Sequence, residues 1–157
     1  MRRSASDLLS QNYGLVAKAL FTPLLDVFGA ARSTFDGDIE RTVVLLEVAV
    51  RTLQDPRFAD ADLSAVLSGE LGAYPALSAS MRSIADSSGI PKETVRRKVT
   101  ELVLAGWFAR HGASLHYTAQ AYRELAPVRE KIRRMAVRHY EVIAALCVAE
   151  EVRTGGA

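Results

Sequence analysis

The segment from residue 80 to residue 106 constrains the fold of this chain more than any other. Ser78 or Ser80 can cap a short helix over residues 81–87, because a serine side chain accepts from free amides at a helix start. Gly89 follows that helix and can take the positive φ of a tight turn. The inward positions around the turn are predicted to be Ile84, Ala85 and Ile90. The pattern predicts a short helix that ends in a tight turn.

A second helix is predicted directly after this turn. Pro91 stands where proline is favoured, in the first turn of a helix, and Gly106 can close the helix after about Ala105. The apolar residues at helical spacing are Val95, Val99, Leu102 and Val103. The polar residues on the remaining surface include Lys92, Glu93, Arg96, Arg97 and Thr100. One side should therefore be buried, and the other should be exposed and largely basic.

A short β-hairpin is predicted after Gly106. Residues 107–110 are expected to form one strand, residues 111–114 the turn and residues 115–117 the return strand. Thr118 is expected to cap a final helix that runs to about Val152. Helix, tight turn, helix and hairpin is the winged helix-turn-helix plan. The predicted fold class is mainly α, with a small hairpin wing and flanking terminal helices.

Residues 83–118, with SIADSSGIPKETVRRKVTELVLAGWFAR at their centre, resemble the winged-helix domains of the MarR and GntR types of bacterial transcriptional regulator. The matching parts are the IA pair, the SGIPKETVRRKV turn and second helix, the L…GW exit and the YT after the hairpin. The resemblance covers roughly a quarter of the chain. It implies a sequence-specific DNA-binding regulator, a repressor by expectation, rather than an enzyme. The second helix would enter the major groove, and the hairpin would touch the backbone or the minor groove.

The resemblance also implies which residues would contact double-stranded DNA. The base-reading candidates are Lys92, Glu93, Thr94, Arg96 and Arg97. The backbone candidates are Arg82, Lys98, Arg110 and His111. Basic side chains neutralise phosphates, and arginine can also read guanine through paired hydrogen bonds. Glu93 could accept from cytosine N4 or could stabilise the helix N-terminus.

Three regions are predicted along the chain: a helical arm over residues 1–35, the winged domain over 36–118 and an amphipathic helix over 119–157. The arm should be helical from residue 5 to residue 30, with Pro23 ending or kinking it. The final helix repeats apolar residues at intervals of three and four, namely Leu125, Val128, Ile132, Met135, His139, Ile143 and Leu146. MarR-type proteins dimerise through terminal helices, so the resemblance implies a homodimer.

A further helix is predicted at the start of the winged domain. Asp38 can act as its N-cap, and Asp55-Pro56 stops it. The expected buried stripe consists of Ile39, Val43, Leu46, Val50 and Leu53. A short helix over residues 60–67 is also plausible.

The formal net charge is only +2, but the charge is unevenly distributed. Residues 36–62 hold seven acids and three bases, whereas residues 81–110 hold six bases and three acids. Residues 122–138 hold six bases and two acids. Positive charge therefore gathers in the C-terminal half. The run from Arg129 to Arg138 could be a second DNA contact or the solvated face of an amphipathic helix.

Composition limits the compartment and the chemistry. Cys147 is the single cysteine, which excludes an internal disulfide and fits a reducing cytoplasm. No secretory signal is evident, and the apolar run Leu15–Phe28 is interrupted and too short for a membrane span. No phosphate-binding loop, nucleophile elbow or metal-ligand cluster is present, although His111 and His116 flank the hairpin. We expect no cofactor, no metal and no membrane partner.

Two alternatives to an operator-binding regulator remain open. A winged helix can serve only as a protein-binding module, without specific DNA binding. The regulator could also respond to a small-molecule effector held between the flanking helices and the winged domain, which the apolar stripes permit but do not specify.

Overall fold

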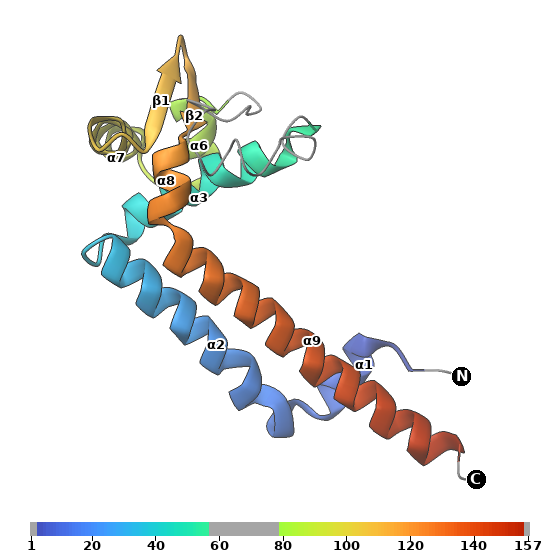
Figure 1. The fold of residues 1–157 in the computed structure, drawn as a ribbon. Coiled ribbons are helices and arrows are strands. Elements are labelled where there is room, and N and C mark those ends of the chain that lie inside the picture. Colours follow the sequence, from blue (N-terminus) through green and yellow to red (C-terminus); the bar gives the residue numbers. More distant parts are fainter. Residues whose placement is uncertain (1–2, 57–78, 156–157) are drawn as a thin grey trace. The chain divides into compact units, whose positions relative to one another are not determined.

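The computed structural model describes residues 3–56 and 79–155 (Figure 1). The plausible helix over residues 60–67 therefore lies outside the described residues. The chain divides into two compact units. We call residues 32–126 the hairpin unit, and residues 1–31 together with 127–157 the helical unit.

The predicted fold class is confirmed at the level of a mainly helical chain with one small antiparallel sheet of two strands. The elements of the hairpin unit are α3 (Ile39–Gln54), α6 (Met81–Ser88), α7 (Lys92–Leu104), β1 (Phe108–His111), β2 (Ser114–Tyr117) and α8 (Ala119–Glu124). The elements around the helical unit are α1 (Ala5–Gln11), α2 (Tyr13–Thr34) and α9 (Ala126–Gly155). The unit boundaries cut α2 and α9 near their ends.

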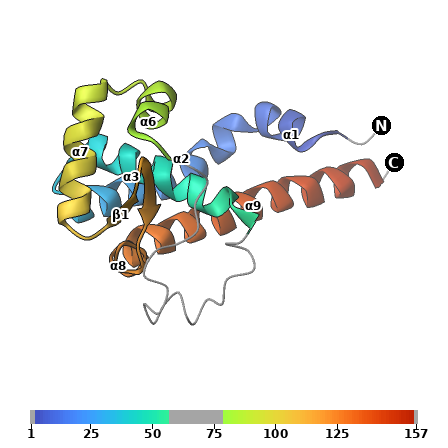
Figure 2. The same cartoon turned by 90° about the horizontal axis from the view of Figure 1, so that it is seen from above.

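The hairpin unit has a core of its own. Helices α3, α6 and α7 contact one another, α7 also contacts β1, and α3 contacts β2. Among the described residues, the largest side chains with less than 2% exposure are Phe35, Val44, Leu45, Val48, Ile84, Val95, Val99, Leu102 and Leu115. All nine belong to this unit, and Figure 2 shows its helices grouped around the hairpin.

The turn between α6 and α7 forms as predicted. Ser80, not Ser78, caps α6, and its capping box with Ser83 satisfies two amides at the helix start. Gly89 ends α6 at a φ of 72°, a backbone conformation that residues with a side chain rarely adopt. Pro91 is the N-cap of α7, one residue before the first helical turn in which it was expected.

The hairpin is one residue tighter at each side than predicted. His111 pairs with Ser114 in the ladder, so the loop is only Gly112-Ala113. Gly112 has a φ of 61°, and a glycine of positive φ at the first loop position is typical of a type II′ turn, whose twist matches the strands. The amide of Leu115 also donates to the carbonyl of Ala79 at 3.0 Å, which joins the approach to α6 to this sheet.

The predicted buried stripe of α3 is wrong. The residues with an exposed fraction of 42–63% are Ile39, Leu46, Val50 and Leu53, and Val43 is half-buried. The buried residues of α3 are Val44, Leu45, Val48 and Thr52. Helix α3 is apolar on two sides, and helical spacing alone does not say which side faces the core.

The N-terminal arm is two helices rather than one. Asn12 caps α1, and its amide donates to the carbonyl of Leu8. Pro23 does not end α2, which continues for eleven residues beyond it. Proline removes a backbone hydrogen bond inside a helix. Close to that point, the carbonyl of Leu20 contacts Nε2 of His139 at 2.9 Å, so α9 makes a polar contact with α2.

Helix α2 is long and apolar enough, by length and composition alone, to cross a membrane, and 11% of its apolar window is buried. The expectation that this run is too short does not hold, because the helix extends from residue 13 to residue 34. This test is also met by the core helices of proteins that do not enter membranes.

The predicted C-terminal helix is also divided in two. Thr118 caps α8, as expected, but Leu125 leaves the helical conformation and α9 starts afresh at Ala126. Pro127 explains the break, since a proline has no amide to continue the ladder of α8 and is tolerated in a first turn. The structure thus groups α8 with the hairpin unit, whereas the sequence placed it with the C-terminal helix.

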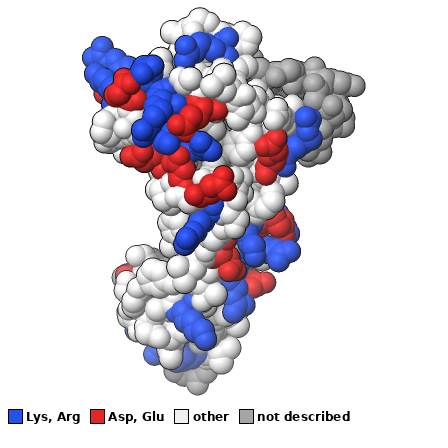
Figure 3. All heavy atoms as spheres, turned by 90° about the vertical axis from the view of Figure 1, so that its left-hand side faces the viewer, with Lys and Arg blue, Asp and Glu red and all other residues white. Residues whose placement is uncertain are grey.

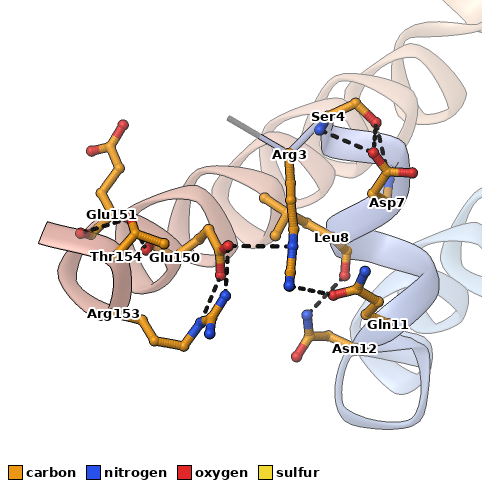
Figure 4. A network of polar contacts seen from close by, with 10 residues as sticks. All are labelled: Arg3, Ser4, Asp7, Leu8, Gln11, Asn12, Glu150, Glu151, Arg153 and Thr154. Carbon is orange, nitrogen blue, oxygen red and sulfur yellow. Dashed lines mark hydrogen bonds and ion pairs between the residues drawn. The ribbon is translucent and has the colours of Figure 1, made fainter. Parts of the chain in front are cut away.

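Polar contacts fasten α1 to the end of α9 (Figure 4). Nη1 of Arg3 donates to Gln11 at 2.6 Å, and its Nε lies 3.5 Å from Glu150. Glu150 in turn accepts from Arg153. The hydrogen bond from Arg153 contributes most to holding the pKa of Glu150 below its ordinary value, and the charges of Arg153 and Arg3 lower it further.

Candidate nucleic-acid interface

Helix α7 is oriented by its buried side. Val95, Val99 and Leu102 are 0–1% exposed and pack into the core of the hairpin unit, as predicted. Val103 is half-buried rather than fully buried. Because these residues fill one stripe, the rest of the helix surface must point away from the core.

The exposed side of α7 carries most of the predicted base-reading residues. Lys92, Glu93, Arg96 and Arg97 are exposed, together with Thr100, and Thr94 is half-buried at the edge. Figure 3 looks toward this side of the hairpin unit, where Lys and Arg spheres gather with Asp and Glu spheres among them. The structure therefore brings the five base-reading candidates to one helical surface.

The basic residues of this surface differ in their availability. Arg96 makes a bidentate ion pair with Glu93, with Nε 2.9 Å from Oε2. This hydrogen bond lowers the pKa of Glu93, so the carboxylate stays ionised at neutral pH. Lys92 and Arg97 make no ion pair or hydrogen bond with their side chains inside the described part of the chain. Their charges are therefore the ones most available to an external anion.

The backbone candidates Arg82, Arg110 and His111 are also exposed. Arg82 lies one turn before Asp86 on α6, with 3.8 Å between Nε and Oδ2, and its side chain is 83% exposed. Nη2 of Arg110 lies 4.0 Å from the sulfur of Met81, so the hairpin lies next to the start of α6. The ring of His111 meets that of His116 edge to face at 4.8 Å.

Lys98 does not belong to this surface. Its side chain is 10% exposed, and Nζ donates to Asp38 at 2.6 Å and lies 3.4 Å from Glu101. Its register explains the burial, since it lies one residue before Val99 on the side of α7 that faces α3. The ammonium group of Lys98 is bound by carboxylates of the protein itself, so we remove Lys98 from the candidate DNA contacts.

Lys98 is part of a charge network that the sequence did not reveal. Asp38 caps α3 through the amide of Arg41, and Nη2 of Arg41 donates to Glu101 on α7 at 2.6 Å. Burial favours a higher pKa for Asp38, but the Lys98 hydrogen bond, the Arg41 amide and both charges outweigh it and lower the pKa. The Arg41 hydrogen bond, followed by that of Lys98, lowers the pKa of Glu101. The network links α3 to α7 across 60 residues of sequence.

The exit from α7 is held by Gly106, Thr118 and Gln120. Gly106 has a φ of 76°, and a Cβ there would lie 2.5 Å from Oε1 of Gln120. Thr118 donates to the carbonyl of Gly106 at 2.8 Å and accepts from Ala121 as the cap of α8. Phe35 and Trp107 meet edge to face at 5.3 Å beside this exit. These contacts set where the hairpin lies relative to α7.

Over residues 3–56 and 79–155, no group of three or more His, Cys, Asp or Glu side chains is placed to hold a metal ion. Comparison with protein-family models, curated proteins and solved structures gave no match to this chain.

Proposed function

We propose that the hairpin unit is a winged helix-turn-helix that binds double-stranded operator DNA, and that the protein is a cytoplasmic transcriptional regulator acting as a homodimer. The observation that carries this proposal is the exposed surface of α7. Among the described residues, Lys92 and Arg97 have no ion-pair or hydrogen-bond partner for their side chains, while Val95, Val99 and Leu102 are buried in the core on the opposite side. A basic helix held rigidly next to a hairpin suits insertion into the major groove.

The polar residues of this surface divide by expected role. Arg97 would read a base edge or neutralise a phosphate, and Lys92, at the helix start, would contact the backbone. Arg96 would contact DNA after exchanging its surface ion pair with Glu93, an exchange that costs little at an exposed site. Arg82, Arg110 and His111 would contact phosphates on either side.

Selection of bound sequences from random duplex DNA tests this proposal. Wild type should enrich a palindrome, and the double substitution Arg96→Ala, Arg97→Ala should abolish the enrichment. The matched control is Arg3→Ala, Arg153→Ala, which removes the same charge from two exposed arginines outside both the hairpin unit and the Arg129–Arg138 run. The control should keep the palindrome. Weak, salt-sensitive binding without enrichment in wild type would reject operator recognition.

A protein-binding role is the second candidate, because α3 exposes a stripe of Ile39, Leu46, Val50 and Leu53. Exposed apolar patches of this kind often mark interaction sites. Under that reading, the α7 arginine variants would leave function intact, whereas Leu46→Glu with Val50→Glu would abolish it.

A further inference from the structure

The hairpin carries two of the three histidines of this chain, and the fold brings them together. His111 is the last residue of β1 and His116 lies inside β2, so a turn separates them in the sequence. Their rings meet edge to face, with 4.8 Å between the ring centres and 85° between the ring planes. From the sequence, in which the two residues merely flank a hairpin, we expected no metal site. The contact between the rings makes that expectation worth revising.

The register of the two strands explains this contact. His111 pairs with Ser114 and His116 pairs with Ala109, so these four side chains leave the same face of the sheet. We call this the histidine face. His111 and His116 are diagonal neighbours on it, a separation that long side chains can bridge. The pairing of the backbones therefore sets the two rings beside each other.

The other face of the hairpin supplies its buried side chains. Phe108, Leu115 and Tyr117 are 1–5% exposed, and the strands contact α3 and α7. The histidine face therefore points away from this core, and accordingly His111 is exposed and His116 is half-buried. An ion in solution can reach both rings without crossing the protein interior.

The spacing of the rings suits two imidazoles on one metal ion. A Zn–N bond of about 2.1 Å places each ring centre about 3.2 Å from the ion, so two ligands at right angles or at the tetrahedral angle have their ring centres roughly 4.5–5.2 Å apart. The observed 4.8 Å lies inside this range. The terminal torsion of a histidine is broad, so each ring can turn one nitrogen toward a shared ion. Binding therefore needs a rotation of the rings and no movement of the strands.

Imidazole nitrogen selects the kind of ion. It suits zinc, copper and nickel, whereas magnesium and calcium prefer oxygen ligands. A ligating imidazole uses one nitrogen for the metal and donates from the other, so a further hydrogen bond to either ring is compatible with binding. In the described part of the chain, no third His, Cys, Asp or Glu side chain joins the pair. The remaining coordination positions would hold water or an oxygen from another molecule.

We propose that His111 and His116 together bind one divalent transition-metal ion, of the zinc, copper or nickel type, on the histidine face of the hairpin. A structural zinc site is closed by four protein ligands, whereas this site has two and keeps positions open for a further ligand. The ion therefore exchanges with solution, and the fold does not depend on it.

The open positions give the ion a part in DNA contact, and this part of the inference rests on the proposed function. His111 belongs to the residues assigned to the DNA backbone. A bound ion would add two positive charges where the hairpin is proposed to meet phosphates, which strengthens binding to a polyanion. Zinc should therefore increase the DNA affinity of wild type. His116→Ala should remove this increase, although His116 is not itself among the proposed DNA contacts.

Isothermal titration calorimetry of the full chain with zinc chloride tests the site without DNA. Wild type should bind one ion per chain at the hairpin. His111→Ala and His116→Ala should each weaken binding at least about ten-fold, because the loss of a residue that only supports a ligand already costs about 10–100-fold. The matched controls are His139→Gln and Cys147→Ser, which remove the remaining histidine and the single thiol, both outside the hairpin unit. Both controls should leave the affinity unchanged within experimental error.

A gain of affinity provides a second test that does not depend on removing either ring. Ser114 lies opposite His111 on the histidine face, so Ser114→His places a third imidazole there and should tighten zinc binding at least about ten-fold. Nuclear magnetic resonance locates the ion, since zinc should shift the imidazole signals of His111 and His116 and leave those of His139 in place. Magnesium chloride should shift none of them.

A wild type that binds no zinc overturns the inference and leaves the two rings as an aromatic pair only. Binding that His139→Gln or Cys147→Ser removes, while His111→Ala and His116→Ala keep it, also overturns it.

The metal site and the proposed function fail separately. Zinc binding by the two histidines without enrichment of a palindrome would reject DNA recognition and leave the site standing. A palindrome enriched by a protein that binds no zinc would do the reverse. Zinc binding that leaves the DNA affinity of wild type unchanged would reject the part of the ion in DNA contact.

Discussion

The two units of this protein differ in how much of their apolar surface is buried. Among the described residues, all nine of the largest fully buried side chains belong to the hairpin unit, where α3, α6, α7 and the hairpin contact one another. The described part of the helical unit has four buried hydrophobic residues along three helices and exposes ten large ones. A compact arrangement of helices and a hairpin can bury its own apolar side chains, whereas two long antiparallel helices have too much surface for their volume. The difference indicates which unit can be stable alone.

The largest expected effect compares equivalent substitutions in the two units. Leu102→Ala should lower the free energy of unfolding by about 3 kcal/mol, because it removes a fully buried side chain and leaves a cavity. Leu8→Ala changes a residue that is also buried, but one held by the short helix α1 at the edge of the helical unit. It should cost less than half as much. Urea unfolding midpoints of both variants give the comparison, and equal losses would contradict it.

A smaller effect should follow from the network between α3 and α7. Lys98→Met removes the cation beside Asp38 and Glu101 and should cost about 2 kcal/mol, because the carboxylates lose a partner in a poorly solvated site. Combining it with Asp38→Asn should restore part of the loss, since asparagine keeps the N-cap of α3 without the charge. A double-mutant cycle on unfolding free energies measures this coupling. Additive losses would show that Lys98 and Asp38 do not interact.

The same network predicts how stability depends on acid. The pKa values of Asp38 and Glu101 lie below their ordinary values of 3.8 and 4.5 in the folded protein. Near pH 4 the unfolded chain therefore binds more protons than the folded one, and stability rises with pH. The contribution is complete above the ordinary values and is lost as pH falls through the lowered ones. Urea midpoints between pH 3 and pH 6 should fall less steeply in the variant that combines Lys98→Met with Asp38→Asn.

The smallest expected effect is at Glu130 in the helical unit. Arg133 and Arg134 hydrogen-bond this carboxylate and lower its pKa to about 2. The side chains of Arg133 and Arg134 are nevertheless 67% and 66% exposed, so water screens the interaction. Glu130→Gln should leave the urea midpoint unchanged within experimental error. A clear loss of stability would show that exposed charge pairs stabilise the helical unit. It would contradict the expectation that only the Lys98 network between α3 and α7 contributes measurably.

Predictions from local sequence were confirmed where a backbone conformation strongly favours one residue type, or where one side of a helix is clearly apolar. Gly89 has the positive φ expected of it, and Val95, Val99 and Leu102 are buried as their spacing predicts. Pro23 does not end the helix, which was one of the two outcomes expected of it, since α2 continues beyond this residue. Pro127, at which the long final helix was expected to continue, marks its true interruption.

The candidate interface was predicted in part. Lys92, Glu93, Thr94, Arg96 and Arg97 all come from one short helix, so helical spacing sufficed to place them together. The prediction that Lys98 contacts DNA was wrong because the environment of this side chain depends on Asp38, which lies 60 residues earlier in the sequence. No local pattern distinguishes a lysine that meets solvent from one that meets a distant carboxylate.

The sequence by itself determined the order of elements around the turn and the hairpin, because glycine, proline and capping serines act on their immediate neighbours. Tertiary structure alone decided which side of α3 is buried, and that Lys98 belongs to the interior. Both outcomes depend on surfaces brought by other elements: α3 offers two apolar sides, and packing against α6, α7 and β2 selects Val44, Leu45 and Val48 over Leu46 and Val50. Burial is a property of a pair of surfaces, and a single helix carries only one of them.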